Sequence, residues 1–253
     1  MAIESSLIVG AGKFGRRFYD FLQAHGQDPI TLSKSDKAWS QQHIRLDLLA
    51  KSLQLPSLPK IDQLYLIVAP TYRTQEAYQN IYIDGLGNLL RALLKQQRSF
   101  HATFLSSTAV YGSQRLGLID ENSPTQPDNF RGELLLQAEQ QIQQMAPSSS
   151  IVRASGLYSR QRERLLQSLL DKQKASDAKW LNLVHEADLC QWLLKASENQ
   201  WPSVIASDGV PFQRTQLYQE QAVDKQGYRQ FKSQYFEQMD LQYVSFVDWF
   251  DSL

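Results

Sequence analysis

The chain alternates short apolar runs with longer stretches in which apolar positions recur at helical spacing. Buried strands of a parallel sheet read as continuous apolar runs, because helices cover both of their faces. Helices that pack on such a sheet show an apolar stripe at every third or fourth residue. The runs predicted to be strands are 7–9, 30–32, 44–46, 64–69, 103–105 and 151–152.

Three stretches between these runs carry an apolar stripe, and each predicts a helix against the sheet. After residue 154 the pattern loosens, although 181–184 still indicates a strand and 187–195 a helix. The alternation predicts an α/β fold, a Rossmann-type doubly wound parallel sheet with a small C-terminal substrate-side appendage. We expect residues 1–155 to form the core of this fold, and 156–253 to complete that core and add the substrate-side region within one compact unit. The stripes are Phe14, Phe18, Phe21 and Leu22; Leu86, Leu89, Leu90, Leu93 and Leu94; and Leu134, Leu135, Ala138 and Ile142.

The charge balance and the cysteine content limit which partners and which cell compartment we expect for this protein. The 253 residues include 26 basic and 26 acidic side chains, so no overall charge would hold the protein on nucleic acid or on an anionic membrane. The one cysteine, Cys190, cannot form an internal disulfide, and no apolar run is long enough to span a bilayer. We therefore expect a cytoplasmic protein with no nucleic-acid or membrane partner.

A glycine turn follows the first predicted strand and opens the first predicted helix. Residues 10–15 read Gly-Ala-Gly-Lys-Phe-Gly, the GxGxxG pattern of dinucleotide-binding folds. Gly10 permits the tight turn, Gly12 lets the backbone approach a diphosphate, and Gly15 allows the helix to pack closely on the strand. The start of the helix then presents unpaired N–H groups to the phosphates. We predict a dinucleotide cofactor here, which makes residues 1–155 the NAD(P)-binding core, with a purely structural turn as the alternative.

The end of the second predicted strand should decide between NAD and NADP. An Asp or Glu there would bind the ribose 2′-hydroxyl of NAD. The sequence has Ser33 and Lys34 instead, which suit a 2′-phosphate and favour NADP. If the strand ends later, Asp36 could bind the ribose, and NAD remains the alternative cofactor. Lys34 could also be an ordinary exposed loop residue without a role in binding. The residues expected to contact the cofactor are Gly10, Gly12, Lys13, Phe14, Gly15, Ser33, Lys34 and Ala69.

Further segments resemble the extended short-chain dehydrogenase/reductases, the NAD-dependent epimerase/dehydratase family that works mostly on nucleotide sugars. The most specific is Phe-Leu-Ser-Ser-Thr-Ala-Val-Tyr-Gly at 104–112, which is similar to the family's fifth strand and the loop after it. The resemblance implies a small-molecule substrate such as a nucleotide sugar, and a homodimer paired through two long helices. Other segments similar to family motifs are 85–90, 121–124, 153–158 and 182–185 with Asp188.

The family's proton relay is missing from its usual place. In that family a Ser or Thr bonds the substrate oxygen, and a Tyr with a Lys four residues later moves the proton beside the nicotinamide. One helical turn sets the ammonium beneath the phenol and lowers the Tyr pKa. By motif Ser107 holds the Ser position, but 129–135 reads Asn-Phe-Arg-Gly-Glu-Leu-Leu, with no such pair. A Tyr-xxx-Lys at 228–232 lies far beyond Ser107 and is interpreted as a coincidence. The chain therefore most resembles an atypical branch that lacks the pair.

Tyr111 is the candidate acid in place of the missing tyrosine. It follows the predicted fifth strand, at the carboxyl edge of the sheet where ligands bind. Its alternative role is a partly buried ring with a hydrogen-bonded hydroxyl. His185 could contact substrate, but a hydrogen-bonded loop histidine is the plainer interpretation, and Asp188 could simply support a helix start. The four histidines show no close metal spacing, so no metal site is predicted.

Two functions remain open. The first is an NAD(P)-dependent oxidoreductase or epimerase that uses Ser107 and Tyr111 as its catalytic residues. The second is a non-catalytic NADP-binding module that senses redox state or regulates a partner. Residues 151–180 hold seven basic and three acidic side chains, which could face an anionic substrate, although solvated surface charge is the plainer interpretation.

Overall fold

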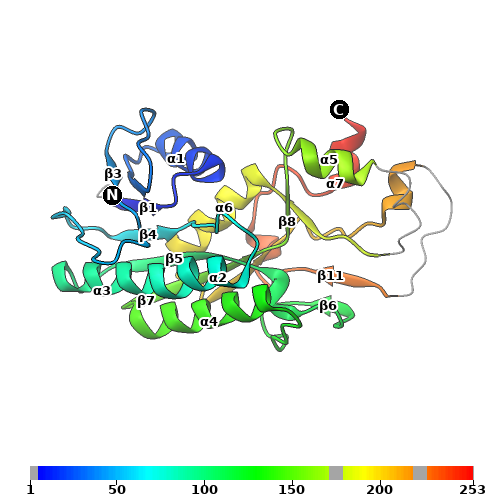
Figure 1. The fold of residues 1–253 in the computed structure, drawn as a ribbon. Coiled ribbons are helices and arrows are strands. Elements are labelled where there is room, and N and C mark those ends of the chain that lie inside the picture. Colours follow the sequence, from blue (N-terminus) through cyan, green and yellow to red (C-terminus); the bar gives the residue numbers. More distant parts are fainter. Residues whose placement is uncertain (1–4, 171–178, 219–226, 253) are drawn as a thin grey trace.

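The computed structural model describes residues 5–170, 179–218 and 227–252. Seven parallel strands form the central sheet in the order β10-β7-β5-β4-β1-β2-β3 (Figure 1). This arrangement confirms the predicted Rossmann-type α/β fold. The strands are β1 (Ser6–Val9), β2 (Ile30–Ser33), β3 (His43–Arg45), β4 (Gln63–Leu66), β5 (His101–Ser107), β7 (Ser148–Ala154) and β10 (Ser203–Ala206).

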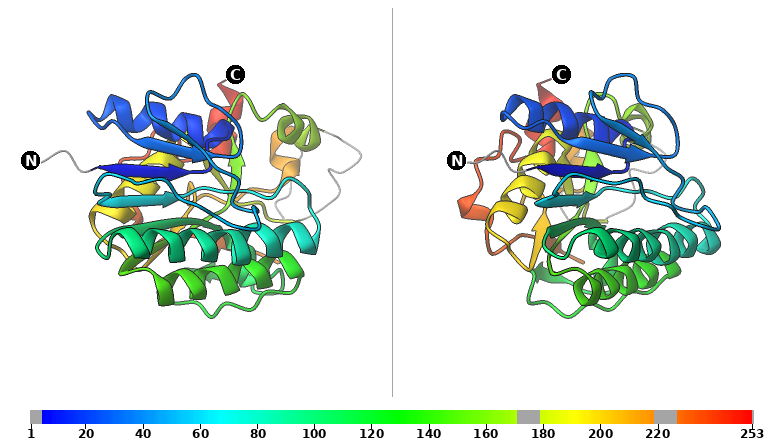
Figure 2. Two further views of the ribbon diagram at one scale, coloured as in Figure 1. Left: turned by 60° about the vertical axis from the view of Figure 1, so that its left-hand side comes forward. Right: turned by 90° about the vertical axis from the view of Figure 1, so that its left-hand side faces the viewer.

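Helices cover both faces of this sheet (Figure 2). Helices α1 (Lys13–Ala24) and α6 (Glu186–Glu198) pack on one face, and α3 (Leu86–Gln96) and α4 (Phe130–Met145) on the other. A short helix α2 (Gln75–Tyr78) and the π-helical segment η1 (Gln79–Gly85) lead directly into α3. The three predicted apolar stripes lie on α1, α3 and α4 and supply most of their buried side chains.

Two hydrophobic cores lie on the two faces of the sheet. Successive strand residues point to opposite faces. In β4, Leu64 therefore joins the core beneath α3 and α4, whereas Tyr65 joins the core beneath α1 and α6. Burial on both sides explains why the strands read as continuous apolar runs.

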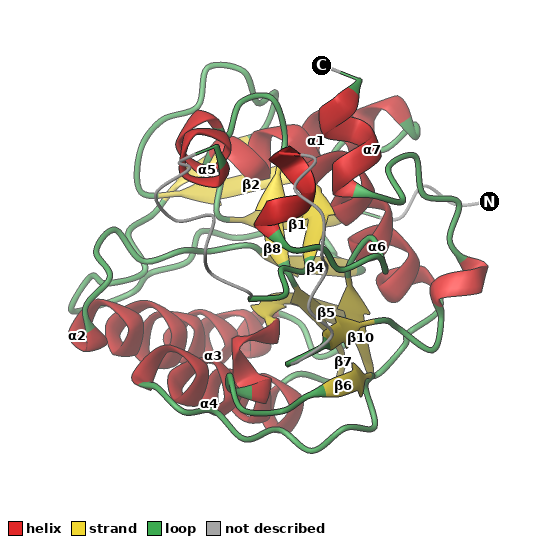
Figure 3. Cartoon of the chain, turned by 90° about the vertical axis from the view of Figure 1, so that its right-hand side faces the viewer, coloured by secondary structure: helices red, strands yellow, loops and turns green. Residues whose placement is uncertain are grey.

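The chain after residue 155 both completes the core and forms a smaller lobe. It returns to the sheet as α6 and β10, and the segment around η5 (Phe236–Gln238) packs on the core beneath α1 and α6. The other described elements lie mainly beyond one end of the central strands, where β6 (Gly117–Ile119) from earlier in the chain joins them (Figures 1 and 3). We call this part, after its expected role, the substrate-side lobe. It contains β6, β8 (Gly156–Tyr158), α5 (Glu163–Leu169), β9 (Leu183–His185), η4 (Arg214–Tyr218), β11 (Arg229–Phe231) and α7 (Phe246–Asp251), with β6 paired to β11 and β8 to β9.

The observed elements differ from the sequence expectations at a few places. The run 64–69 is a strand only to Leu66, and the residues after it are irregular. The predicted strand 181–184 becomes the short β9, preceded by an isolated bridge between Leu181 and Phe212. Strand β10 was not predicted from the sequence. None of the helices in the described ranges combines the length and hydropathy needed to cross a bilayer.

Candidate functional site

The glycine turn has the geometry that its sequence predicts. Gly10 has a φ of +110°, and a Cβ there would lie 2.3 Å from the carbonyl oxygen of Ile67. A Cβ on Gly15 would lie 2.0 Å from the carbonyl oxygen of Gly10, so α1 can approach β1 only with glycine at this position. By contrast, a Cβ on Gly12 would meet nothing within 4 Å. The turn is tightly packed at both ends and open in the middle.

The start of α1 has no side-chain cap among the residues that the structure describes. Gly12 is the N-cap residue, and the first turn of the helix holds no acidic residue. The first amides of a helix have no partner within it, and together with the helix dipole they favour a phosphate. Lys13 is exposed beside them, whereas the Phe14 ring is buried in the α1 and α6 core, which leaves only the Phe14 backbone for a ligand. These residues fit the diphosphate of a dinucleotide.

Charged side chains surround the end of β2. The strand ends at Ser33. The side chain of Lys34 is 77% exposed, and its ammonium lies 2.9 Å from the carboxylate of Asp47. Asp36 lies three residues beyond the strand and pairs with Arg45 at 3.1 Å. Arg45 stands opposite Ser33 in the register of β2 and β3. Sequence reasoning missed Arg45, because only strand pairing brings it to this edge.

Ala69 and Ser107 lie along the same edge of the sheet as the glycine turn. Strands β1, β4 and β5 are neighbours and parallel, so the residues after them meet at one edge. Ala69 is exposed two residues beyond Ile67, whose carbonyl packs against Gly10. Ser107 is the last residue of β5, half-buried, and its hydroxyl accepts a hydrogen bond of 3.2 Å from the N–H of Ala109.

The start of α4 packs closely on the loop that follows Ser107. A Cβ on Gly132 would lie 2.5 Å from the carbonyl oxygen of Ala109. This is the helix on which the family carries its Tyr and Lys. Here Phe130 is half-buried and packs edge-on against Tyr78 with ring centroids 5.6 Å apart, and Arg131 is exposed. Neither side chain can replace a phenol and an ammonium stacked one turn apart.

The distant Tyr228 and Lys232 do not form such a pair either. They flank the strand β11, so one helical turn does not bring them together. The Tyr228 hydroxyl donates to the side chain of Gln230 at 2.8 Å, and the Lys232 ammonium donates to Glu237 at 3.0 Å.

Tyr111 belongs to a buried polar network beneath the end of β5. Its hydroxyl donates to the carbonyl oxygen of Asp120 at 3.1 Å and accepts from Arg153 at 2.8 Å. Arg153 in turn donates to Glu139 at 2.7 Å, and the Ser106 hydroxyl donates to the same carboxylate at 2.5 Å. Burial raises the pKa of Tyr111 to about 12. This geometry supports the structural alternative for Tyr111, and its catalytic role stays a prediction. Sequence reasoning missed this network.

His185 and Asp188 make structural contacts at the start of α6. The Nδ1 atom of His185 accepts from the N–H of Ala187 at 3.2 Å, and burial lowers the His185 pKa to about 4. Asp188 accepts from the backbone N–H groups of Gln242 and Tyr243 at 2.9 and 2.8 Å, while burial raises its pKa. Asp188 therefore fastens the C-terminal segment to α6 in addition to supporting the helix start.

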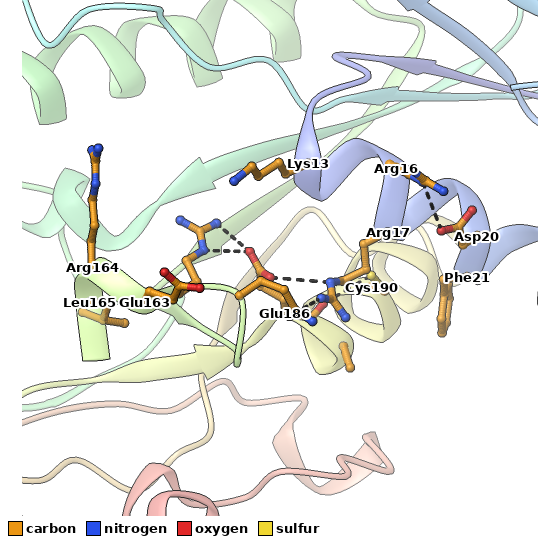
Figure 4. A pocket seen from close by; sticks show the side chains of 13 residues that line it. Lys13, Arg16, Arg17, Asp20, Phe21, Glu163, Arg164, Leu165, Glu186 and Cys190 are labelled. Atoms are coloured by element: carbon orange, nitrogen blue, oxygen red, sulfur yellow. Dashed lines mark hydrogen bonds and ion pairs between the residues drawn. The ribbon is translucent and has the colours of Figure 1, made fainter. Parts of the chain in front are cut away.

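A cleft of about 1200 Å³ opens beside the glycine turn (Figure 4). One wall is α1, from Lys13 to Phe21, and the opposite wall is the segment 161–165 at the start of α5. The first turns of α6 form a further wall, where the buried Cys190 thiol donates to the carbonyl oxygen of Glu186.

Glu186 joins three elements at this cleft. It is buried, and its carboxylate accepts from the Ser159 hydroxyl at 2.7 Å and from two nitrogens of Arg162 at 2.8 and 2.6 Å. Arg17 of α1 lies 3.5 Å from the same carboxylate and also donates to Gln161 at 2.9 Å. This carboxylate therefore ties the helix of the glycine turn to the substrate-side lobe. Sequence reasoning missed it, because a glutamate at a helix start reads as a surface residue.

Comparison with known proteins gives a partial sequence match and a fold match over the whole chain. Residues 73–188 match the family model described as RmlD substrate binding domain. The structure is similar to that of a putative NAD-dependent epimerase/dehydratase from Methylobacillus flagellatus, with a TM-score of 0.76 and 22% identity over 100% of this chain and 98% of that chain. Among curated proteins, none matches the sequence.

Two further structures extend the comparison. The nucleoside-diphosphate sugar epimerase from Corynebacterium glutamicum has a TM-score of 0.80 and 17% identity, over 98% of this chain and 57% of that chain. The structure of MoeE5 in complex with UDP-glucose and NAD has a TM-score of 0.70 and 18% identity, over 90% of this chain and 85% of that chain. Together with the match over residues 73–188, these neighbours show that the chain has the Rossmann-type fold of proteins described as NAD-dependent epimerase/dehydratase and short-chain dehydrogenase/reductase proteins. Its residues 129–135 lack the Tyr and Lys pair of the family that the sequence resembles.

Proposed function

We propose that the protein binds NADP, with NAD as the alternative, and acts as an oxidoreductase or epimerase on a nucleotide sugar or another small polar substrate. The observation that carries the proposal is the open centre of the glycine turn. A Cβ at Gly12 would meet nothing within 4 Å, and α1 begins there without a side-chain cap. Gly10 and Gly15 are packed against backbone, whereas Gly12 faces open space at the position where a diphosphate would rest. The nicotinamide ring of the cofactor would supply hydride transfer.

The preference for NADP rests on the side chains at the end of β2. Ser33 and Lys34 stand where an acidic residue would otherwise bind the ribose of NAD. Arg45 adds a second cation opposite Ser33. Both cations have carboxylate partners at the surface, and a 2′-phosphate would compete with those carboxylates for them.

Ser107 is proposed to bind the reacting oxygen of the substrate. It ends β5, two strands from the glycine turn, on the edge where Rossmann folds bind ligands. Its hydroxyl accepts from the N–H of Ala109 and can still donate its own proton to a substrate oxygen. Without the Tyr and Lys pair, this hydroxyl positions the substrate, and it does not by itself supply a base.

The nature of the substrate is inferred from the structural neighbours. One of them is described as a nucleoside-diphosphate sugar epimerase, and another was solved with UDP-glucose and NAD. These descriptions support a nucleotide sugar as the first substrate class to test on this chain.

The alternative function is a non-catalytic NADP-binding module. It is favoured by the two places near Ser107 where a proton donor would be expected. The Tyr111 hydroxyl is buried and bonded on both sides, and the start of α4 carries Phe130 and Arg131 where the family has its relay. Such a module would signal cofactor occupancy to a partner through the C-terminal segment.

Turnover assays separate the two functions. NADPH oxidation with a panel of nucleotide sugars and small carbonyl compounds should be reduced about 100-fold by Ser107→Ala, as expected when one hydrogen bond to the reacting oxygen is lost. The matched control is Ser113→Ala, six residues further along, whose hydroxyl bonds Asp128 at the surface. Turnover that Ser107→Ala leaves unchanged would reject the role of Ser107. Cofactor binding without turnover on any substrate would favour the module.

A further inference from the structure

Ser107 and Gly112 cap the two ends of one short turn. This 3-10 turn, η2 (Thr108–Tyr111), follows β5, and at its start the Ser107 hydroxyl accepts from the N–H of Ala109. At its end the N–H of Gly112 donates to the carbonyl oxygen of the same Ala109 at 3.1 Å. The backbone of Ala109 therefore connects the Ser107 side chain to the far end of the turn.

The turn is packed closely against backbone at two places. Gly112 has a φ of +64°, and a Cβ there would lie 2.2 Å from the carbonyl oxygen of Gln126. Gly132 of α4 approaches the carbonyl oxygen of Ala109 in a similar way. Closely packed elements shift as units and do not deform smoothly. A displacement at Gly112 is therefore passed on to Ala109 and to the hydroxyl that Ala109 holds.

Arg229 of β11 binds the end of this turn from the substrate-side lobe. Its Nη2 atom donates to the carbonyl oxygen of Gly112 at 2.6 Å, although the two residues are 117 positions apart in the chain. The guanidinium carbon lies 4.6 Å from the centroid of the Phe231 ring. A planar guanidinium can pack on a ring and aim an N–H at an acceptor at the same time. A cation at the last carbonyl groups of a helical turn is also favoured by their dipoles.

The backbone beneath Arg229 is held by two partners. In the pairing of β6 with β11, Arg229 stands opposite Gly117, beyond the end of the central strands (Figure 1). The side chain of Asn182 donates to the carbonyl oxygen of Arg229 at 3.0 Å and accepts from the N–H of Phe231 at 2.8 Å. The arginine therefore extends from a fixed strand of the lobe to the loop that carries Ser107.

The charge of Arg229 has no carboxylate partner among the residues that the structure describes. Its Nε atom is buried without a hydrogen-bond partner, and burial lowers its pKa, while Asp128 acts on it only from a distance. Asp128 is bonded instead to the N–H and the hydroxyl of Ser113. By contrast, Glu139 binds the charge of Arg153. An uncompensated, half-buried cation costs free energy, so stability alone does not explain an arginine at this position.

We propose that Arg229 is a positioning residue for Ser107, because its guanidinium fixes the end of the turn 108–111 and thereby the orientation of the Ser107 hydroxyl. The proposal rests on the proposed function, in which that hydroxyl binds the reacting oxygen of the substrate. Arg229 itself does not contact the substrate. Since β11 belongs to the substrate-side lobe and Ser107 to the Rossmann core, the site depends on how the lobe is placed against the core.

Amide hydrogen exchange, followed by NMR on the full chain, tests this link without any substrate. Arg229→Gln shortens the side chain and removes the hydrogen bond to Gly112, so the amides of Ala109 and Gly112 should exchange about 10-fold faster. Arg229→Lys keeps a cationic donor and should restore most of the protection. Arg115→Gln is the matched control, because Arg115 lies three residues beyond Gly112 and the described residues give it no hydrogen bond or ion pair. It should change either rate less than twofold.

Two results would overturn the proposal. One is exchange at both amides that Arg229→Gln leaves within twofold of wild type, and the other is equal acceleration by Arg115→Gln. The thermal unfolding midpoint shows whether each variant is folded. If Arg229→Gln is not folded, Arg229→Met replaces it, because an apolar side chain of similar length leaves no polar group buried.

A double-mutant cycle tests whether Arg229 acts through Ser107. On a substrate that the wild type turns over, Arg229→Gln should lower kcat about 10-fold and leave the Kd for NADPH within twofold. In a Ser107→Ala background the same change should have no further effect. A full effect in that background would overturn the proposal. A wild type that turns over no substrate but shows the expected exchange rates would reject the proposed function and leave the link between Arg229 and Ser107 standing.

Discussion

The guanidinium of Arg153 donates a hydrogen bond of 2.8 Å to the hydroxyl of Tyr111, and both side chains are buried. The same guanidinium is bound by the Glu139 carboxylate, so the charge beneath the Ser107 loop is already compensated. Burial raises the pKa of Tyr111 to about 12, although the nearby Arg153 charge acts in the opposite direction. The phenol is therefore protonated at neutral pH and cannot take the part of a phenolate base.

We predict that Tyr111→Phe lowers stability and leaves activity nearly unchanged. The variant keeps the ring but removes the acceptor of a buried Arg153 N–H, which should cost about 1 to 3 kcal/mol. Urea denaturation measures this loss, while NADPH affinity and turnover should stay within twofold of wild type. A large loss of turnover at unchanged stability would instead give Tyr111 a catalytic role.

A second prediction concerns acid stability and His185. The pKa of this histidine is about 4 in the folded protein because it is buried, against 6.5 when unfolded. Between pH 4 and 6.5 the unfolded chain therefore binds more protons at this residue than the folded protein does. The free energy of unfolding is unaffected by His185 above pH 6.5, and it decreases as the pH falls from 6.5 toward 4. The loss amounts to roughly 3 kcal/mol.

The variant His185→Asn isolates this effect from other titrating groups. Asparagine can still accept the hydrogen bond from the N–H of Ala187 at the start of α6. Chemical denaturation at a series of pH values should show a steeper loss of stability for wild type than for the variant between pH 6.5 and 4. Parallel curves for the two proteins would mean that His185 is not buried in its neutral form.

The third prediction addresses cofactor preference. Lys34→Gln should raise the Kd for NADPH about 10-fold, since it removes a cation from the expected 2′-phosphate position, and should leave the Kd for NADH unchanged. Lys37→Gln is the matched control, because Lys37 donates to Ser35 in the same loop. Equal Kd values for NADPH before and after the Lys34 change would remove Lys34 from the cofactor site. Tighter binding of NADH than of NADPH by wild type would favour the alternative role of Asp36.

The fold could be predicted where local chemistry and burial agree. The run 7–9 is followed by a turn in which Gly15 must pack on Gly10 of the same segment, so strand, turn and helix can be predicted from that segment alone. The contact of Gly10 with the distant Ile67 could not be predicted in this way. The strands buried on both faces are apolar throughout, and the stripes on α1, α3 and α4 repeat at helical spacing. Strand β10 could not be predicted from the sequence, because it is only four residues long and its partner strand β7 lies about fifty residues earlier in the chain.

Only the part of the candidate site that lies in local sequence motifs could be predicted from the sequence. Gly10, Gly12 and Gly15 carry their roles within six residues, and Ser107 is located by a motif on one strand. The buried Glu186 gains its role from contacts with Arg17 and Arg162 across the fold. A sequence shows that such a residue is charged, but it does not show what it faces.

The fourth prediction separates the roles of two glycines in the turn. Gly12→Ala should fold with a loss of less than about 1 kcal/mol, because the added Cβ enters open space, but it should raise the Kd for NADPH at least 10-fold by obstructing the diphosphate. Gly15→Ala should lose about 3 kcal/mol or more, because its Cβ would overlap the carbonyl of Gly10. Urea denaturation and cofactor titration of both variants make the comparison. Equal effects of the two changes on folding would contradict the described turn.

Cofactor binding by the unmodified protein tests the central claim most directly. The chain contains five tryptophans, so NADPH and NADH can be titrated against intrinsic fluorescence. The open glycine turn predicts saturable binding with a Kd in the micromolar range, tighter for NADPH than for NADH. Absence of binding by either cofactor at millimolar concentration would contradict the account.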